Sequence, residues 1–163
     1  MKTMVISAFP GTGKSYAFKN CSNSFKISDS DSSQFSWIEE ERGRIRNPDF
    51  PDNYIQHIKN NIGKYDVIFV SSHLEVRQAL NDAGIEYFTI YPQANLLEEY
   101  KERYIQRGND EHFIDFIVNN WSEMMKNISH EPHGFGLLRL ESGQYIGDLL
   151  SLYDGFKCIL DQL

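Results

Sequence analysis

The sequence has few cysteines, no long apolar run and no excess of positive charge. Its two cysteines, Cys21 and Cys158, lie far apart without the spacing of a metal site, which indicates free thiols in a reducing, intracellular setting. No stretch approaches the length of a membrane span, and the chain runs from Met1 almost directly into a short apolar segment. We therefore expect no signal peptide, no membrane partner and a cytoplasmic location.

The charge balance excludes another class of protein. With 16 lysines and arginines against 23 aspartates and glutamates, the net charge is −7, which argues against a large non-specific surface for nucleic acid. Basic residues concentrate in the first two-thirds of the chain. The net charge therefore does not exclude a small basic cleft that admits DNA. The length predicts one domain, residues 1–163, and the composition is compatible with a monomer or a dimer.

The strongest motif joins an apolar run to the start of a helix. A strand is expected at residues 4–9 and a helix at residues 14–20, and the loop between them contains Gly11 and Gly13. Glycine takes backbone angles closed to other residues, so successive N–H groups of this loop can point into one concavity. The helix start adds free N–H groups and a positive dipole end, and together these features predict a phosphate-binding loop.

Two side chains complete this motif. Lys14 supplies a mobile charge for β- and γ-phosphates, and the Ser15 hydroxyl is placed for Mg²⁺. Ala8 stands where the usual first glycine would be, at a strand end that tolerates small residues. The alternative is a glycine-rich turn with no ligand. The candidate ATP-binding residues are Pro10, Gly11, Thr12, Gly13, Lys14, Ser15 and Tyr16.

Strand and helix patterns alternate along the chain, which predicts an α/β fold with a parallel sheet. Further strands are expected at residues 24–28, 66–71, 85–91 and 137–140, and further helices at residues 51–62, 73–83, 95–107, 111–128 and 145–153. Asn95 is the expected N-cap of its helix, and a polar, irregular stretch covers residues 29–50. Phe113, Phe116, Ile117, Trp121 and Met124 share one face of the 111–128 helix, and we expect this face in the core.

Two carboxylates follow the second expected strand. Asp29 and Asp31 fall at the edge where an open α/β sheet binds its ligand. One of them can serve Mg²⁺ and the other can accept the proton of an attacking hydroxyl, and the sequence does not assign which. The alternative is a solvated turn, or a helix capped by Asp31. The third expected strand ends in Ser71, Ser72 and His73, without the acidic residue that many phosphate-loop proteins keep there.

Further candidates for binding the acceptor lie around these carboxylates. His73 either contacts the substrate or simply starts the next helix. Arg42, Arg44 and Arg46 share one face of an extended segment and suit phosphate groups, unless the neighbouring glutamates at 39–41 neutralise them. Phe35 and Trp37 can each stack on a base or anchor the loop to the core.

Arg103 and Arg107 lie four residues apart on one helix face, before a break at Gly108. This pattern predicts a hinged lid over residues 100–112 whose arginines neutralise charge on a moving phosphoryl group. The alternative is an exposed helix on which these arginines pair with glutamates such as Glu99.

Together these motifs resemble the P-loop nucleoside and nucleotide kinases, of the thymidylate-kinase-like group. The resemblance rests on the loop ending in Gly13-Lys14-Ser15, on Asp29-Ser30-Asp31, on residues 100–107 and on residues 138–143. It extends to small phage-encoded kinases, including those that phosphorylate 5-hydroxymethyl-deoxyuridine in DNA. It implies a three-layer P-loop NTPase fold with helices on both faces of a five-stranded parallel sheet of order 2-3-1-4-5, a small helical lid, and an acceptor-site region at residues 29–50.

The function implied is ATP- and Mg²⁺-dependent phosphotransfer to a nucleoside, a nucleotide or a modified pyrimidine, also within DNA. Catalytic roles then fall to Lys14, Asp31, Arg103 and Arg107, and metal binding to Ser15 and Asp29. The Asp29/Asp31 pair favours a hydroxyl acceptor, as in shikimate kinase. A small-metabolite kinase and a regulatory nucleotide-binding module are the two alternatives.

Overall fold

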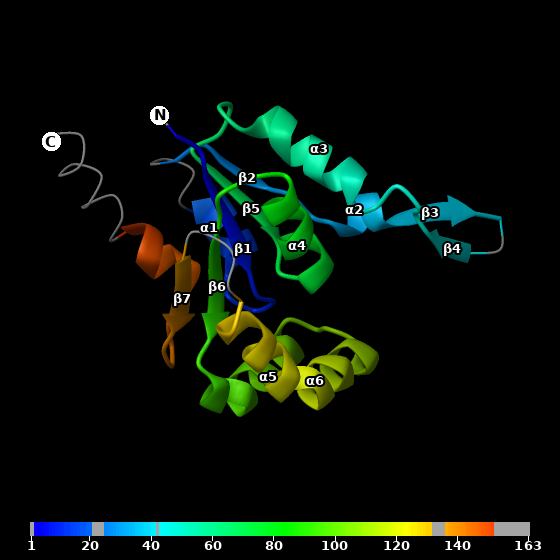
Figure 1. Cartoon of the computed structure of the whole chain (residues 1–163). Coiled ribbons are helices and arrows are strands. Elements are labelled where there is room, and N and C mark those ends of the chain that lie inside the picture. Colours follow the sequence, from blue (N-terminus) through cyan, green and yellow to red (C-terminus); the bar gives the residue numbers. More distant parts are fainter. Residues whose placement is uncertain (1, 21–24, 42, 132–135, 152–163) are drawn as a thin grey trace, which may run out of the picture.

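The fold is built around a five-stranded parallel sheet. The computed structural model describes residues 2–20, 25–41, 43–131 and 136–151. The sheet has the order β2-β5-β1-β6-β7 (Figure 1). Its strands are β1 Met4–Ala8, β2 Ile27–Asp29, β5 Val67–Ser71, β6 Phe88–Pro92 and β7 Gly136–Leu140. The expected α/β class and five-stranded parallel sheet are confirmed.

The numbering of the sheet differs from the expected 2-3-1-4-5 because the chain contains two strands that the sequence did not predict. β3 (Trp37–Glu40) and β4 (Gly43–Arg46) pair antiparallel in a separate hairpin that extends away from the sheet (Figure 1). Both strands are exposed along their whole length, so they lack the buried apolar pattern that identifies a strand. Without the hairpin, the sheet contains the second, third, first, fourth and fifth strands along the chain.

Helices pack on both faces of the sheet, which is consistent with a three-layer arrangement. The helices are α1 Lys14–Asn20, α2 Ser33–Ser36, α3 Asp52–Asn61, α4 Leu74–Asp82, the 3₁₀ turn η1 Ala94–Leu96, α5 Leu97–Gln106 and α6 Glu111–Ser129, and residues 146–151 are also helical. On one face, α3 and α4 bury Ile58 and Leu80 against Ile68. On the other face, Ala17 of α1 and the 146–151 helix pack against Phe69. Adjacent residues of β5 therefore pack against the helices on opposite faces of the sheet.

The parallel register brings the polar strand ends together at one edge. Ala8 at the end of β1 pairs with Ser71 at the end of β5, and Asp29 at the end of β2 pairs with Phe69. The β1–α1 loop, the residues after β2 and the β5–α4 turn therefore lie side by side at the carboxyl edge. This is the edge at which open α/β sheets bind ligands.

The pair α5–α6 forms a third apolar cluster beside that edge. Ile117, Trp121 and other α6 residues pack against Phe9 and α5. Phe116 is 56 % exposed, so its expected place in the core is wrong, and the buried face is instead completed by Ile114, Met125 and Ile128. The expected cap at Asn95 is also wrong, because residues 94–96 form a 3₁₀ turn before α5.

Among the described residues, none of the helices combines the length and the apolar character that crossing a bilayer requires. Cys21, Cys158 and the end of the helix expected at 145–153 lie outside the described residues. The expectation of one domain over the whole chain stays a prediction.

The start of α6 offers a test of the fold. The Asp110 side chain accepts a hydrogen bond of 2.9 Å from the backbone N–H of Phe113 and caps the helix. We expect Asp110→Ala to lower the free energy of unfolding by about 1 kcal/mol, as measured by urea denaturation. Asp115→Ala is the control, because Asp115 is exposed inside the same helix and alanine is a better helix former. Equal stability of the two variants would contradict the assigned helix start.

Candidate functional site

The loop between β1 and α1, residues 9–13, is held from outside by its carbonyl groups. We call this segment the glycine loop. The Tyr104 hydroxyl donates to the Pro10 carbonyl (2.9 Å), Arg103 Nη1 to the Gly11 carbonyl (3.1 Å) and the Ile146 N–H to the Thr12 carbonyl (2.9 Å). In a trans peptide the N–H points away from the preceding carbonyl. The N–H groups of Gly11 and Gly13 therefore point away from the Tyr104 hydroxyl and the Ile146 N–H, respectively.

Both glycines of the loop are required by their surroundings. Gly11 has φ +82° and Gly13 has φ +95°, values that favour glycine. A Cβ at Gly11 would lie 2.9 Å from the Tyr104 ring, and one at Gly13 would lie 3.0 Å from the Tyr145 ring. The glycines permit both the backbone turn and the close packing of two tyrosines against it.

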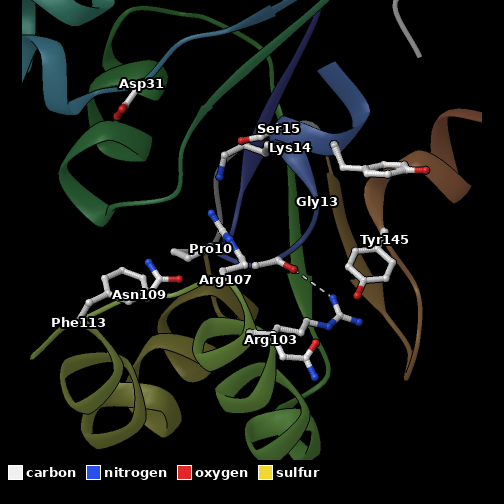
Figure 2. Close-up of a pocket in the computed structure, with 13 residues that line it drawn as sticks. Pro10, Gly13, Lys14, Ser15, Asp31, Arg103, Arg107, Asn109, Phe113 and Tyr145 are labelled. Atoms are coloured by element: carbon white, nitrogen blue, oxygen red, sulfur yellow. Dashed lines mark hydrogen bonds between the residues drawn. The ribbon is translucent and has the colours of Figure 1, made fainter. Parts of the chain in front are cut away.

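Lys14 begins α1 and enters the same cavity. Its Nζ donates to the Ala8 carbonyl (2.8 Å), and burial lowers the pKa of Lys14 to about 8, with nearby Arg107 adding to the depression. Figure 2 shows Lys14 and Arg107 reaching toward one another from opposite walls. Two cations directed at one space, beside the glycine loop, make a site complementary to an anion.

Two cavities meet at Lys14. The first, of about 630 Å³, is lined by Pro10, Gly11, Gly13, Lys14, Ser15, Tyr16, Asp31, Arg103, Gln106, Arg107, Asn109, Phe113 and Tyr145. The second, of about 350 Å³, is lined by Ala8, Pro10, Lys14, Ser15, Asp29, Ser30, Asp31, Ser32, Ser33, Ser36, Trp37, Arg46, Ser71, Ser72 and His73. They share Pro10, Lys14, Ser15 and Asp31. The loop motif and the carboxylates that follow β2 therefore form one continuous site.

The two aspartates differ in their surroundings. The Ser15 hydroxyl donates to Asp29 Oδ2 at 3.4 Å, and burial raises the pKa of Asp29. Asp31 Oδ1 accepts from the Ser33 N–H (2.9 Å) just before α2, but the N-cap of that helix is Ser32, so this contact is a local turn within the segment after β2. Asp31 nevertheless lines both cavities, and in Figure 2 it stands on the opposite side of the loop from Tyr145.

A buried tyrosine fixes the backbone between these aspartates. The Tyr54 hydroxyl donates to the Ser30 carbonyl (2.6 Å) and accepts from the Ser71 N–H (3.3 Å). It therefore ties the segment after β2 to the end of β5. Burial raises the pKa of Tyr54, so its hydroxyl stays protonated and able to donate.

Besides Asp31, the second cavity contains three of the predicted acceptor residues. Trp37 is 44 % exposed, and Arg46 lies over its ring at 5.5 Å while forming an ion pair with Glu75. His73 precedes α4, lines the cavity and makes no side-chain cap, and burial lowers the pKa of His73. At neutral pH its imidazole is therefore uncharged.

Other predicted residues lie elsewhere. Phe35 lines neither cavity as described and packs on Tyr54 (ring centroids 5.2 Å apart), which corresponds to the alternative of a loop anchor. Arg44 faces Glu39 across the hairpin and pairs with it at 2.6 Å, which is the neutralised alternative. Arg42 is outside the described residues.

The two predicted lid arginines occupy different environments. Arg107 is exposed, lines the first cavity and has no ion-pair partner among the described residues. Arg103 is only 8 % exposed and pairs with Glu99 at 2.5 Å. The alternative that the arginines pair with glutamates therefore applies to Arg103, although its face of the helix is buried and not exposed. The lid geometry expected for both arginines fits Arg107 alone.

Several cavity residues were missed from the sequence. Tyr145 covers Gly13, and its position just beyond the expected 137–140 strand was the one available signal. Asn109 lines the first cavity with a buried Oδ1 that has no hydrogen-bond partner within the part of the chain described. Phe113 was predicted as core and also lines this cavity, while Gln106 gave no signal at all.

The oxygen ligands at the junction suit a magnesium–phosphate complex. No group of three or more metal-binding side chains occurs within the described ranges. Ser15 and Asp29 offer one hydroxyl and one carboxylate, beside the Lys14 ammonium that lines the same cavity. Mg²⁺ is held in this way in phosphate-transfer sites, by one or two protein oxygens together with substrate phosphates.

Comparisons with known proteins do not add a family. No protein-family model matches the chain, and no curated protein matches its sequence.

Lys14 allows a test by stability. A depression of its pKa from 10.5 to about 8 makes the charged lysine about 3 kcal/mol less favourable in the folded chain, as the net of burial, repulsion by Arg107 and attraction by Asp29 and Asp31. Methionine removes this charge, so we expect Lys14→Met to raise the free energy of unfolding at pH 7 by about 2 to 3 kcal/mol. Urea denaturation measures it, with the exposed Lys59→Met as control.

The stability difference between Lys14→Met and the wild type should change with pH in a defined direction. The lysine is protonated in both folded and unfolded chains below pH 8, so its destabilising effect is fully present there. Above pH 8 the folded state releases the proton first, and the stability gained by Lys14→Met should shrink until pH 10.5. A variant less stable than the wild type at pH 7, or a gap that does not change with pH, would refute this account.

Proposed function

We propose that this protein is an ATP-dependent phosphotransferase with a P-loop NTPase fold. The observation that carries the proposal is the junction of the two cavities at Lys14, Ser15 and Asp31. A kinase needs a donor space and an acceptor space that meet where the phosphoryl group is transferred.

On the donor side, the glycine loop would bind the β- and γ-phosphates of ATP. The outward-held carbonyls support this role, because they leave N–H groups of Gly11 and Gly13 for the phosphate oxygens. Lys14 and Arg107 would neutralise charge on the γ-phosphoryl group, and their mutual approach in the free protein supports that role. The first cavity is large enough to extend from the phosphates toward Tyr145 and Tyr16.

Ser15 and Asp29 would hold Mg²⁺. When bound, the metal ion would neutralise charge on the phosphate groups of ATP. The contact between the two side chains supports this assignment and leaves Asp31 for the acceptor. Burial leaves the pKa of Asp29 raised overall, although the attraction of Lys14 lowers it more than the repulsion of Asp31 raises it.

Charge in the second cavity favours a hydroxyl as the acceptor. Its lining includes Asp29 and Asp31, while its one cation other than Lys14 within the described residues, Arg46, is paired with Glu75. A phosphate acceptor would require unpaired cations here. In the proposed reaction an acceptor oxygen forms a bond to the γ-phosphorus, the bond from that phosphorus to the β–γ bridging oxygen breaks, and ADP leaves. Asp31 accepts the hydroxyl proton.

The acceptor we favour is a nucleoside, a nucleotide or a modified pyrimidine, also within DNA. Trp37 supports it, because an exposed ring at the mouth of the cavity can stack on a base. The small polar lining, with serines at 30, 32, 33, 36, 71 and 72, equally supports a small hydroxy metabolite as a second candidate. A regulatory nucleotide-binding module is the third.

A transfer assay separates these candidates. Protein, Mg²⁺ and γ-labelled ATP are incubated with nucleosides, nucleoside monophosphates, hydroxymethyl-containing DNA and small hydroxy acids. We expect label on a hydroxyl-bearing acceptor and none when Lys14→Ala replaces the wild type. Label on metabolites alone would favour the second candidate, and tight ATP binding without transfer to any acceptor would favour the regulatory module.

The role of Asp31 is tested by a charge-neutral variant. If Asp31 accepts the proton, Asp31→Asn lowers kcat by about a hundredfold or more and leaves the Kd for ATP within about threefold. Asp115→Asn, on the exposed face of α6, is the matched control and should behave as the wild type. Equal losses in kcat and in ATP affinity would instead make Asp31 a metal ligand.

A further inference from the structure

One ion pair on α5 touches both walls of the first cavity. Glu99 and Arg103 lie four residues apart and are joined at 2.5 Å, with Arg103 buried and Glu99 half-buried. Neither side chain is used for phosphate or acceptor in the function proposed above. Their other contacts run to backbone groups of distant segments, which is unusual for an i,i+4 pair on a helix surface.

Arg103 holds the glycine loop and the segment after β7 at the same time. Its Nη1 donates to the Gly11 carbonyl (3.1 Å) and its Nη2 to the Gln144 carbonyl (3.2 Å). The guanidinium also lies over the rings of Tyr100 (4.5 Å) and Tyr145 (4.0 Å), and Figure 2 shows it extending beneath Tyr145. The planar fork of arginine is what allows two carbonyls and two rings to be contacted together.

Glu99 holds the same segment from its other side. Its Oε2 accepts from the Ser142 hydroxyl (2.7 Å), and its Oε1 accepts from the Gly143 N–H (3.0 Å) as well as from Arg103. These hydrogen bonds lower the pKa of Glu99 against the opposing effect of burial, so it is a carboxylate at neutral pH. The turn at residues 142–144 is therefore fastened to α5 by both members of the pair.

We propose that Glu99 and Arg103 are positioning residues that hold the glycine loop and the 142–144 turn at a fixed separation, so that the first cavity is assembled before a polyphosphate enters. The inference rests on the proposed function only in taking that cavity as the polyphosphate site. It assigns Arg103 to the scaffold of the cavity and leaves Arg107 as the arginine that meets the ligand.

The physical reason is preorganisation. The Gly11 carbonyl fixes the plane of the Gly11–Thr12 peptide, and the adjacent peptides carry the N–H groups of Gly11 and Gly13. Loss of the Arg103 contact would leave this peptide held only by the longer bond from the Thr12 N–H to the Phe9 carbonyl (3.3 Å), and ordering the loosened peptide again on binding would weaken affinity. The 142–144 turn leads into Tyr145, whose ring touches Gly13, so the opposite wall would loosen with it.

The test measures binding of two probes by calorimetry in the presence of Mg²⁺: inorganic tripolyphosphate, which has no base, and ATP. The variants are Glu99→Gln and Arg103→Lys, and the control is Glu98→Gln. Glu98 is exposed on the same helix, so the control substitution makes the same chemical change at a residue without a contact to either loop. Thermal unfolding and circular dichroism of each ligand-free protein are recorded alongside, and binding is measured well below every melting temperature.

We expect the Kd for both probes to rise about tenfold in Glu99→Gln and in Arg103→Lys, and to stay within about twofold in Glu98→Gln. The effect of Glu99→Gln on tripolyphosphate matters most, because Glu99 does not line the first cavity as described and this probe has no base, so a higher Kd must arise through the segments that the pair holds. Kd values equal to the wild type, with only a lower melting temperature, would overturn the proposal and leave the pair a stabilising contact.

Failure of the proposed function gives a different result. Weakened tripolyphosphate binding in the two variants, in a protein that transfers no phosphate, would support the positioning role and remove only the kinase activity. A wild type that binds neither probe would overturn both proposals.

Discussion

The outward fixing of three consecutive carbonyls is the constraint on which the site depends. Pro10, Gly11 and Thr12 each give their carbonyl to a different part of the chain, namely a tyrosine hydroxyl, an arginine and a backbone N–H. A loop of this kind would otherwise rotate its peptides freely, since glycine resists rotation least. Because three carbonyls are engaged by other parts of the chain, the peptides of the loop are fixed in orientation before any ligand binds, which is what the proposed phosphate site requires.

The distribution of charge around this loop divides the site into two halves. Lys14 and Arg107 approach each other on one side, which is unfavourable until an anion lies between them. Asp29 and Asp31 raise the negative potential on the other side, where the neighbouring cation Arg46 is already paired. An anionic donor and a neutral acceptor would each enter the half that suits them. Burial is the main cause of the depressed pKa of Lys14 and of the raised pKa of Asp29, and the like charges of Arg107 and Asp31 add to these shifts.

Local signals were enough for the parts of the fold that are buried. The run at residues 66–71 is apolar and completely buried in β5, and the loop motif before Lys14 follows a strand of the same kind. The β3–β4 hairpin was missed because both of its faces are exposed, so the alternating arginines at 42, 44 and 46 were not matched by a buried apolar face. The site was predicted where one segment carries the chemistry, as at Asp29 and Asp31. It was missed where distant segments meet, as at Tyr145 and Asn109.

Arg103 and Arg107 show why such a distinction lies beyond the sequence. Both follow the same helical spacing on α5, and both are long cations beside glutamates. Arg103 falls within the helix, where Glu99 one turn earlier and the Gln144 carbonyl enclose its guanidinium. Arg107 is the C-cap, and the chain turns away at Gly108, which has φ +72°. One more helical turn therefore moves an arginine from the scaffold to the open cavity, because α5 ends between the two and only its body packs against the glycine loop.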